Sequence, residues 1–210
     1  MVASKMKITY FDFVGLAEPV RFALAMTGEP WEDNRITSEQ FDAIKADLPN
    51  NQVPILEIDS KVLPQSGAQL RFVGKMAGLY PDDPLEAAFA DAATDAVSDS
   101  LARFSPYFHE EDKAKKVLIS RDLAENFLPR WLSNMEKSLK AAGGEYVTSK
   151  KMSIGDIAIA CRLEWIKKGH VEGIPTDMVD GYPLLSALFD RVYAEPRIAS
   201  YREGLLAAKA

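Results

Sequence analysis

A proline at the start of a predicted strand is the first feature of this sequence with chemical consequences. Pro54 precedes the β-favouring residues Ile55 to Ile58, and proline, which has no N–H to give to a sheet, fits the first position of a strand. An X-Pro bond is cis in roughly 5–6% of cases. A cis bond would turn the N–H and C=O of Val53 out of the sheet, where they can pair with a peptide-like ligand lying antiparallel. The simpler alternative, a proline that merely begins a strand, stays open.

Polar residues near this proline in the sequence could hold such a ligand. Gln65 and Ser66 stand at the start of a predicted helix, whose free N–H groups and dipole attract a carboxylate. Gln52 adds an amide, Lys45 adds a cation, and Tyr10 stands at the end of the first predicted strand. These residue types together suit a small anionic peptide. The alternatives are a solvated surface position for Lys45 and Gln52, and a core position for Tyr10.

The elements that must carry these residues alternate along the first part of the chain. Residues 7–11 and 31–36 are expected to form strands, and the segment between them reads as a helix. Pro19 fits the first turn of this helix and Gly28 fits its end. The pattern therefore predicts a pair of parallel strands joined by a helix.

A hairpin and a closing helix are expected next. Residues 38–49 read as a short polar helix or a loop, and β-favouring runs on either side of Asp59-Ser60 suit a hairpin turn. Ser66 is a candidate N-cap for the helix that follows. The order β-α-β and then β-β-α predicts a small α/β domain over residues 1–80.

Beyond this domain the sequence becomes helical in character. Residues 80–84, YPDDP, read as a linker from their composition, and strand signals nearly vanish after them. Apolar residues repeat at helical spacing over 122–140, where Pro129 should kink or break the helix. We expect an all-helical second domain over residues 85–210, whose last predicted helix ends near Pro196.

A capping box is expected at the start of one helix of this second domain. Ser153 and Asp156 have the required spacing, with aspartate in place of the usual glutamate, so Asp156 is interpreted as a folding residue. Cys161 lies on the apolar stripe that follows and is assigned to the core. The two histidines, His109 and His170, are interpreted as surface residues.

Composition restricts the classes of function. The formal net charge of −6 argues against a general polyanion binder. The chain has no run of about 18–20 apolar residues that could span a bilayer, and no signal peptide is recognised at its start. One cysteine and two histidines are too few for a disulfide framework or a typical His/Cys metal site, so we predict no metal and no cofactor. We expect a cytoplasmic protein.

Four segments in order make the sequence resemble the cytosolic glutathione transferases, most closely the sigma class. The resemblance covers nearly the whole chain, and its strength lies in the spacing of motifs that are individually weak. It implies a thioredoxin-like α/β N-terminal domain over residues 1–80 that binds glutathione. It also implies an all-α helical bundle over residues 85–210 that contributes the hydrophobic substrate site. The segments are TYFDFVGLAEPVRFALA, EDNRI, FDAIKADLPNNQVPILEID and PQSGAQLRFV, and the later SIGDIAIA resembles the capping box of the family's second domain.

The resemblance implies that Tyr10 is the catalytic residue, whose hydroxyl donates a hydrogen bond to the glutathione sulfur. A free thiol has a pKa near 8.5, so only a few per cent of it is thiolate at pH 7. A donor aimed at the sulfur favours the anion. Lowering the thiol pKa by two units requires about 3 kcal/mol, which a charge-assisted hydrogen bond and neighbouring dipoles can supply.

The rest of the glutathione site also follows from the resemblance. The backbone of Val53, before a cis Pro54, would pair with the cysteinyl unit. Gln65 and Ser66 would hold the γ-glutamyl carboxylate, and the glycyl end would be reached by the side chains of Lys45 and Gln52.

Two further residues extend this expected site. Phe41 stands where sigma enzymes often have tryptophan, so it can keep the packing but lacks the indole N–H donor. Asp99 matches an acidic residue that reaches the ligand's amino group across a dimer interface. A complete site would then need two subunits, and we expect a homodimer.

One departure from the sigma pattern concerns the sulfur. Arginines commonly follow the tyrosine, but Val14 and Leu16 occupy those places here. A cation that could further stabilise the thiolate is therefore missing, which bears on catalytic strength and on any isomerase activity. Arg21, on the helix that follows, is interpreted as a structural residue in a salt bridge.

The electrophile is expected to bind in an apolar site. Candidates are Phe13, Arg103 and Tyr107, for which helix packing is an equally good interpretation. The leading function is conjugation of the glutathione thiolate to small hydrophobic electrophiles, as in detoxification. Alternatives are a glutathione-dependent isomerase of the prostaglandin-synthase type and a non-catalytic ligand-binding or crystallin-like relative. No nucleic acid or membrane partner is expected.

Overall fold

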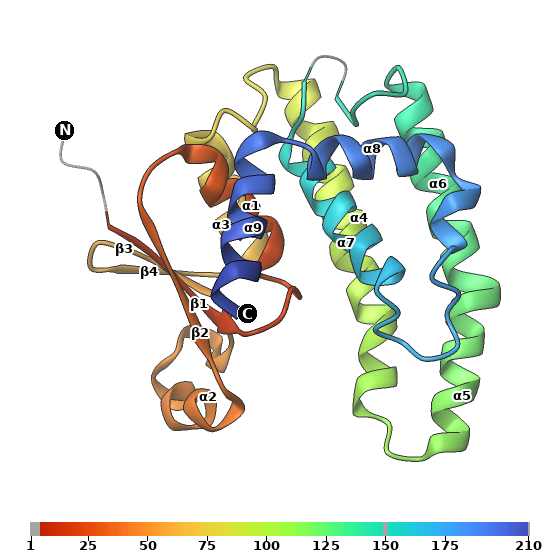
Figure 1. The fold of residues 1–210 in the computed structure, drawn as a ribbon, viewed down its shortest axis with the longest axis horizontal. Coiled ribbons are helices and arrows are strands. Elements are labelled where there is room, and N and C mark those ends of the chain that lie inside the picture. The colour runs from red at the N-terminus through yellow and green to blue at the C-terminus, as the bar shows by residue number, and fades with distance from the viewer. Residues whose placement is uncertain (1–4, 149–150, 210) are drawn as a thin grey trace. The chain divides into compact units, whose positions relative to one another are not determined.

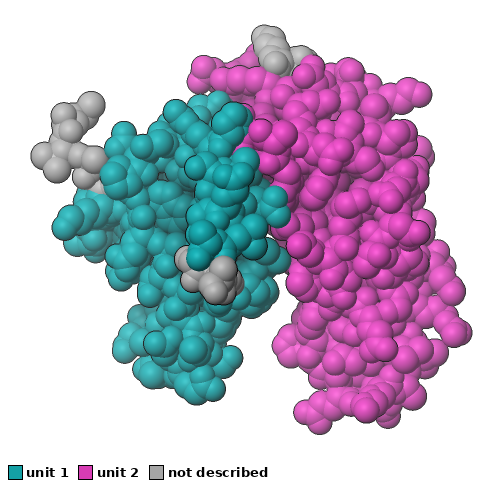
Figure 2. Space-filling view, viewed as in Figure 1, with its two compact units in different colours: residues 1–80, 196–210 teal, residues 81–195 magenta. Residues whose placement is uncertain are grey.

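The computed structural model describes residues 5–148 and 151–209 and divides the chain into two compact units (Figure 2). Unit 1 comprises Met1–Tyr80 together with Pro196–Ala210, and unit 2 comprises Pro81–Glu195. The change from one unit to the other falls in the YPDDP segment. The C-terminal segment, which the sequence assigned to the helical domain, packs with unit 1.

A four-stranded mixed sheet organises unit 1. β1 (Met6–Phe11) pairs in parallel with β2 (Trp31–Ile36), and it pairs on its other side with β3 (Ile55–Ile58). β3 forms an antiparallel hairpin with β4 (Lys61–Pro64), which gives the order β2-β1-β3-β4. The parallel pair and the hairpin are both as predicted, and the expected thioredoxin-like class of this unit is confirmed (Figure 1).

Helices of unit 1 begin and end largely where the local signals place them. α1 (Glu18–Thr27) has a proline in its first turn and ends at Gly28 in the left-handed conformation. It packs against α3 (Ser66–Met76) and α9 (Pro196–Lys209) (Figure 1). Ser66 is wrong as an N-cap, because Gln65 takes that position and Ser66 is the first helical residue.

The segment between β2 and β3 is helical but irregular. α2 (Ser38–Ile44) starts from a capping box formed by Thr37 and Gln40. Two short 3₁₀ turns follow, Lys45–Asp47 and Pro49–Asn51. This segment reaches the start of β3 with Asn50 and Asn51 at positive φ.

The regular elements that the structure describes in unit 2 are all helical. α4 (Pro84–His109) is followed by α5 (Lys113–Asp122), and a π-helical segment, Leu123–Phe127, leads into α6 (Leu128–Ala141). Pro129 lies in the first turn of α6, directly after the π-helical segment, so regular α-helix is interrupted before this proline but the chain does not leave the helical conformation there. Two helices complete the unit, α7 (Ile154–Lys167) and α8 (Pro183–Tyr193), with a short 3₁₀ turn at Met178–Gly181.

Helix α7 is buried along almost its whole length, which makes it the centre of unit 2. Its capping box is present: the Asp156 carboxylate accepts from the N–H and the hydroxyl of Ser153, each at 2.7 Å. It also accepts from the Val147 N–H at 2.8 Å. Burial raises the pKa of Asp156 to about 6, although these donors oppose the shift. Cys161 is buried, as predicted.

The end of the chain differs from the prediction in one respect. α8 ends at Tyr193, near the predicted limit at Pro196, but Pro196 begins a further helix, α9. Ile198 on α9 is fully buried, and Arg197 donates a hydrogen bond to the Met26 carbonyl at the end of α1. Within the described part of the chain, no helix is both long and apolar enough to cross a membrane.

Candidate functional site

A small cavity of about 40 Å³ in unit 1 brings together segments that are distant in sequence. The turn after β1, the residues before β3, the end of β4 and the start of α3 form its wall. The predicted residues Gln52, Val53, Pro54, Gln65 and Ser66 all lie on this wall. The full lining is Leu16, Pro49, Asn50, Gln52, Val53, Pro54, Pro64, Gln65 and Ser66.

The peptide bond between Val53 and Pro54 is cis. Among the described residues, none forms a hydrogen bond with the backbone N–H or C=O of Val53, so both groups can pair with a ligand. Gln69 fixes the segment from inside, because its buried side-chain amide donates to the Pro54 carbonyl at 2.8 Å and to the Leu63 carbonyl at 2.9 Å. A buried side chain thus holds the hairpin and the proline together behind the cavity.

The N-terminus of α3 opens at the same cavity. Gln65 has φ 69° and its side chain does not cap the helix. By contrast, the N-terminus of α2 in the same unit is closed by the Thr37 and Gln40 side chains. The first-turn N–H groups of α3 are therefore available to an anion, and Ser66 brings a hydroxyl to the cavity wall.

Tyr10 is connected to this wall through one hydrogen bond. The N–H of Leu16, which lines the cavity, donates to the Tyr10 hydroxyl oxygen at 3.3 Å. Burial raises the pKa of the Tyr10 phenol, while the Leu16 N–H and the Arg21 charge act in the opposite direction. The phenol therefore stays protonated at neutral pH. Its proton has no acceptor among the residues that the structure describes, so it can be donated to a ligand.

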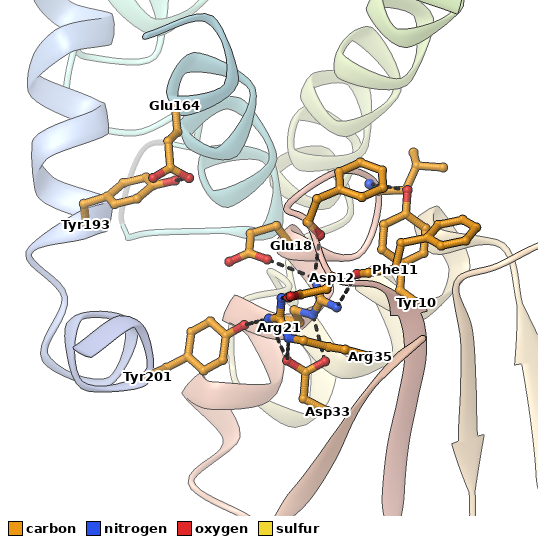
Figure 3. A network of polar contacts seen from close by, with 12 residues as sticks. Tyr10, Phe11, Asp12, Glu18, Arg21, Asp33, Arg35, Glu164, Tyr193 and Tyr201 are labelled. Atoms are coloured by element: carbon orange, nitrogen blue, oxygen red, sulfur yellow. Dashed lines mark hydrogen bonds and ion pairs between the residues drawn. The ribbon is translucent and has the colours of Figure 1, made fainter. Parts of the chain in front are cut away.

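The turn between β1 and α1 is held by a buried arginine (Figure 3). Arg21 is fully enclosed, and its guanidinium donates to two backbone carbonyls of the turn and to two carboxylates. The acceptors are Phe13 O at 2.9 Å, Phe11 O at 3.3 Å, Glu18 at 3.2 Å and Asp33 at 3.0 Å. The predicted salt bridge is confirmed. Arg21 also lies 5.8 Å from the centre of the Tyr10 ring, whereas Val14 and Leu16 contribute no charge to the turn.

A second polar cluster ties the C-terminal helix to the sheet. Arg35 on β2 donates to Asp12 at 2.7 Å, to Asp33 at 2.9 Å and to the Tyr201 hydroxyl at 3.1 Å (Figure 3). Asp33 is shared with Arg21, so α9 is joined to the network that fixes the turn after β1.

Phe41 and Lys45 lie together, outside the lining of the cavity. The Lys45 ammonium is 5.5 Å from the centre of the Phe41 ring. Phe41 packs edge-to-face against Phe11 at 5.3 Å, and Phe11 is 5.4 Å from Tyr10. Lys45 is exposed, in the 3₁₀ turn that packs against the cavity-lining turn Pro49–Asn51. A ligand that extends beyond the cavity could meet it.

The expected electrophile residues fall in both units. Phe13 is 49% exposed on unit 1. In unit 2, α4 and α5 line an open hollow of about 390 Å³, in which Arg103 lies beside Asp122, its ion-pair partner at 3.5 Å. Tyr107 is buried, outside the lining of that hollow, and its hydroxyl accepts from the Glu172 N–H at 3.2 Å. The other lining residues are Ala102, Pro106, Leu118, Ile119 and Leu123.

Asp99 and the histidines lie outside the cavity and the hollow. Asp99 is exposed on α4, and the role expected of it involves a second subunit. His109 and His170 are exposed, as predicted. Among residues 5–148 and 151–209, no group of three or more histidine, cysteine, aspartate or glutamate side chains is placed to hold a metal ion.

Leu16 and Asn50 are cavity residues that the sequence reasoning did not assign to binding. Leu16 contributes through its backbone N–H, and a backbone group cannot be recognised as a binding group from the type of its side chain. Asn50 adopts φ 59°, and asparagine is one of the residues that tolerate this region. A polar turn before a proline was the only available signal for it.

Two family models match the chain. The model described as "Glutathione S-transferase, N-terminal domain" matches residues 6–75. The model described as "Glutathione S-transferase, C-terminal domain" matches residues 98–204.

Similar proteins extend along almost the whole chain. "Glutathione S-transferase 1" of Ascaris suum is 33% identical over 201 residues, which covers 93% of this chain and 94% of that protein. "Hematopoietic prostaglandin D synthase" of Gallus gallus is 31% identical over 196 residues, with 93% and 94% covered. The solved structure of prostaglandin synthase D of Nilaparvata lugens has a TM-score of 0.87 at 36% identity, covering 95% of this chain and 97% of that one.

Proposed function

Because the chain belongs to the glutathione S-transferase family and is therefore a transferase, we propose that Tyr10 and the cavity at Val53 serve a single reaction. In it, the thiolate of glutathione attacks small hydrophobic electrophiles. The observation that carries the proposal is the gathering of Gln52, Val53, Pro54, Gln65 and Ser66 on one cavity wall, one hydrogen bond away from the Tyr10 hydroxyl.

The peptide is bound mainly by backbone groups. The free N–H and C=O of Val53 pair with the cysteinyl unit of glutathione in the manner of an added strand. The γ-glutamyl carboxylate lies at the uncapped N-terminus of α3, beside Gln65 and Ser66. Gln52 and Lys45 take the glycyl carboxylate, and the Lys45 ammonium lies over the Phe41 ring.

Tyr10 stabilises the thiolate that carries out the attack. The Leu16 N–H donates to the phenol oxygen, which leaves the phenolic O–H to donate to the glutathione sulfur. The thiol proton leaves to solvent, the sulfur lone pair forms the new bond to carbon, and a leaving group such as halide departs in a substitution. With no arginine at positions 14 and 16, the hydrogen bond from Tyr10 carries most of this stabilisation.

The same proposal includes the enzyme class of the chain, its place in the cell and its assembly into a dimer. The chain is a sigma-like member that acts in the cytoplasm in detoxification, with glutathione as co-substrate and without a cofactor. It forms a homodimer in which Asp99 of one copy completes the site of the other. Phe13, Arg103 and Tyr107 are the candidates for contact with the hydrophobic electrophile; Phe13 is exposed on unit 1, whereas Tyr107 is buried in unit 2.

Turnover of chlorodinitrobenzene with glutathione tests the role of Tyr10. Tyr10→Phe should lower kcat/KM at pH 7 about 25-fold, because a two-unit rise in thiol pKa, from about 6.5 to about 8.5, lowers the thiolate fraction by that factor. Tyr146→Phe, a partly exposed tyrosine of unit 2, is the matched control and should leave the rate unchanged. Equal rates for wild type and Tyr10→Phe would contradict the assignment.

Glutathione-dependent isomerisation is the second candidate function. The similarity to the Gallus gallus and Nilaparvata lugens prostaglandin synthases favours it. The uncharged Val14 and Leu16 beside Tyr10 argue against it, because they remove the cations that sigma enzymes commonly have there. A panel of aryl halides, enones and a prostaglandin precursor, each assayed with glutathione, separates the two functions by which substrate turns over fastest.

A further inference from the structure

A buried glutamine on α3 lies behind the candidate site of unit 1. The side chain of Gln69 is fully enclosed, although glutamine is mostly found at exposed positions. Its Nε2 donates to the Pro54 carbonyl at 2.8 Å and to the Leu63 carbonyl at 2.9 Å. Because both neighbours are acceptors, the amide nitrogen must face them. The Oε1 atom is then left enclosed, with no hydrogen-bond donor among residues 5–148 and 151–209.

The unpaired oxygen shows that packing does not explain this glutamine. A buried acceptor without a donor is unfavourable, and an apolar side chain of similar size would avoid that penalty. What a glutamine adds is two N–H groups on a single atom, which neither an apolar side chain nor a hydroxyl supplies. The use of both donors therefore explains the residue type at position 69.

Two prolines explain why donors are needed at this place. Pro54 precedes β3, and Pro64 ends β4 opposite Ile55 in the register of the hairpin. Neither proline has an N–H to give, so this end of the hairpin has carbonyl groups but fewer backbone donors. The carbonyls that Gln69 binds belong to Pro54 itself and to Leu63, the residue before Pro64. The side chain from α3 thus takes the place of backbone donors that the prolines lack.

Gln69 joins three segments of the cavity wall. Pro54, Pro64 and Gln65 represent these segments in the lining, and Gln69 itself lies outside the lining. It holds the start and the end of the hairpin through its side-chain amide. It holds the start of α3 because its own backbone N–H donates to the Gln65 carbonyl at 3.0 Å. One residue behind the cavity therefore fixes the spacing of the segments in front of it.

The anchored Pro54 carbonyl also restricts Val53. The ring of a proline fixes its φ, and the peptide unit that joins Pro54 to Val53 is planar. Holding the Pro54 carbonyl in place therefore also sets the direction of the Val53 C=O. Within the described ranges, the N–H and C=O of Val53 have no hydrogen-bond partner. The backbone groups that a peptide would meet are thus oriented by the Gln69 amide.

We propose that Gln69 is a positioning residue that sets the affinity of the cavity for the peptide backbone of glutathione. This inference rests on the proposed function, and it adds a residue that contacts neither the ligand nor Tyr10. Without the two donors, Val53 and Ser66 no longer hold neighbouring parts of one peptide at a fixed spacing. The hydrogen bond from Leu16 to Tyr10 does not involve Gln69, so the loss falls on binding and not on the chemical step.

Binding of S-methylglutathione tests this role apart from the reaction. The probe has the whole peptide but no free thiol, so its affinity does not depend on thiolate formation. Gln69→Met removes both donors at similar length, and calorimetric titration of the full chain should show about tenfold weaker binding than in the wild type. In turnover, the variant should raise KM for glutathione about tenfold and leave kcat unchanged. A fall in kcat without a rise in KM would overturn the proposal.

Val73→Ala is the control for a loss of stability alone. Val73 lies one turn further along α3 and is fully buried. Its truncation destabilises the same helix by leaving a cavity, and it should keep the wild-type dissociation constant for the probe. Weakening of binding by an equal factor in this variant would overturn the assignment to the Gln69 amide.

The titration also separates this inference from the proposed function. Gln69→Leu replaces the methionine variant should that variant not fold. Equal dissociation constants in the wild type and the Gln69 variant would overturn the role of Gln69 and leave the proposed function standing. A wild-type protein that does not bind S-methylglutathione would overturn both.

Discussion

Each of the two units buries an arginine, but the two arginines differ in their hydrogen-bond acceptors. Arg21 in unit 1 is fully enclosed and has four hydrogen-bond acceptors, two of them carboxylates. Arg162 in unit 2 is nearly as buried, but it contacts only ring faces and has no acceptor among the described residues. The comparison shows that two arginines can be similarly buried and yet differ in their hydrogen-bond partners. Four acceptors fix Arg21 in place, whereas ring contacts are the interactions of Arg162 with the described residues.

The same contrast applies to the backbone. The candidate site of unit 1 depends on a cis peptide bond, an uncapped helix and residues at positive φ such as Asn50 and Gln65. Unit 2 consists of helices, which include the π-helical segment Leu123–Phe127, and several of them are closed by capping side chains such as Asp83, Asp112 and the Ser153–Asp156 pair. Irregular backbone leaves N–H and C=O groups free for a peptide, whereas capped helices leave recognition to side chains.

Removing each buried arginine is the strongest test of this comparison. Arg21→Met removes the guanidinium that contacts the buried carboxylate of Glu18 and that holds the turn carrying Leu16, so we expect a loss of about 3–5 kcal/mol in unfolding free energy. Arg162→Met removes a charge that no carboxylate in residues 5–148 and 151–209 pairs with, and it should be neutral or stabilising. Urea unfolding of both variants measures the difference, and similar destabilisation by the two would break the contrast.

A glycine in the turn after β1 allows a smaller and more local test. Gly15 has φ +41°, and a Cβ there would lie 2.6 Å from both the Tyr10 hydroxyl and a Phe13 ring carbon. Gly15→Ala should cost about 1–3 kcal/mol of stability through strain and overpacking. It should also lower kcat/KM at least tenfold, because the Tyr10 hydroxyl is displaced.

The matched control for this substitution is Gly78→Ala. Gly78 also has a positive φ, +69°, but a Cβ there would meet nothing within 4 Å. Gly78→Ala should lower the stability only through the strain of a positive φ, without any steric clash. It should leave kcat/KM at the wild-type value. If both alanine variants keep full activity, the packing of Gly15 against Tyr10 does not matter for the reaction.

Local chemistry explains how much of unit 1 the sequence predicted. Pro19 and Gly28 mark the two ends of α1, and the Asp59-Ser60 turn marks the hairpin, because each acts on the backbone of its immediate neighbours. Five of the expected binding residues meet on one cavity because the turn before β3 and the start of α3 are joined by the short hairpin. The predicted N-cap of α3 was wrong by one residue. Gln65 takes that position with a positive φ, which a glutamine in the sequence does not indicate.

Long-range contacts explain what the sequence could not predict. Arg35 and Tyr201 are 166 positions apart, and no local pattern connects α9 to the sheet of unit 1. The lack of an acceptor for Arg162 depends on which residues of α4 and α7 pack together, so it becomes visible only in three dimensions. The hypothesis that Tyr10 is catalytic came from the resemblance to a family, because residue spacing alone would have left Tyr10 as a core aromatic.

The pKa of the bound glutathione thiol is the most direct test of the central claim that Tyr10 stabilises the thiolate. It can be measured from the ultraviolet absorbance of the thiolate as a function of pH, in wild type and in Tyr10→Phe. Because burial raises the pKa of the Tyr10 phenol, the hydroxyl remains a donor across the titration and should hold the thiol pKa below its solution value. We predict a midpoint about two units below 8.5 in the wild-type protein and a return towards 8.5 in the variant. The same midpoint in both proteins would contradict the account.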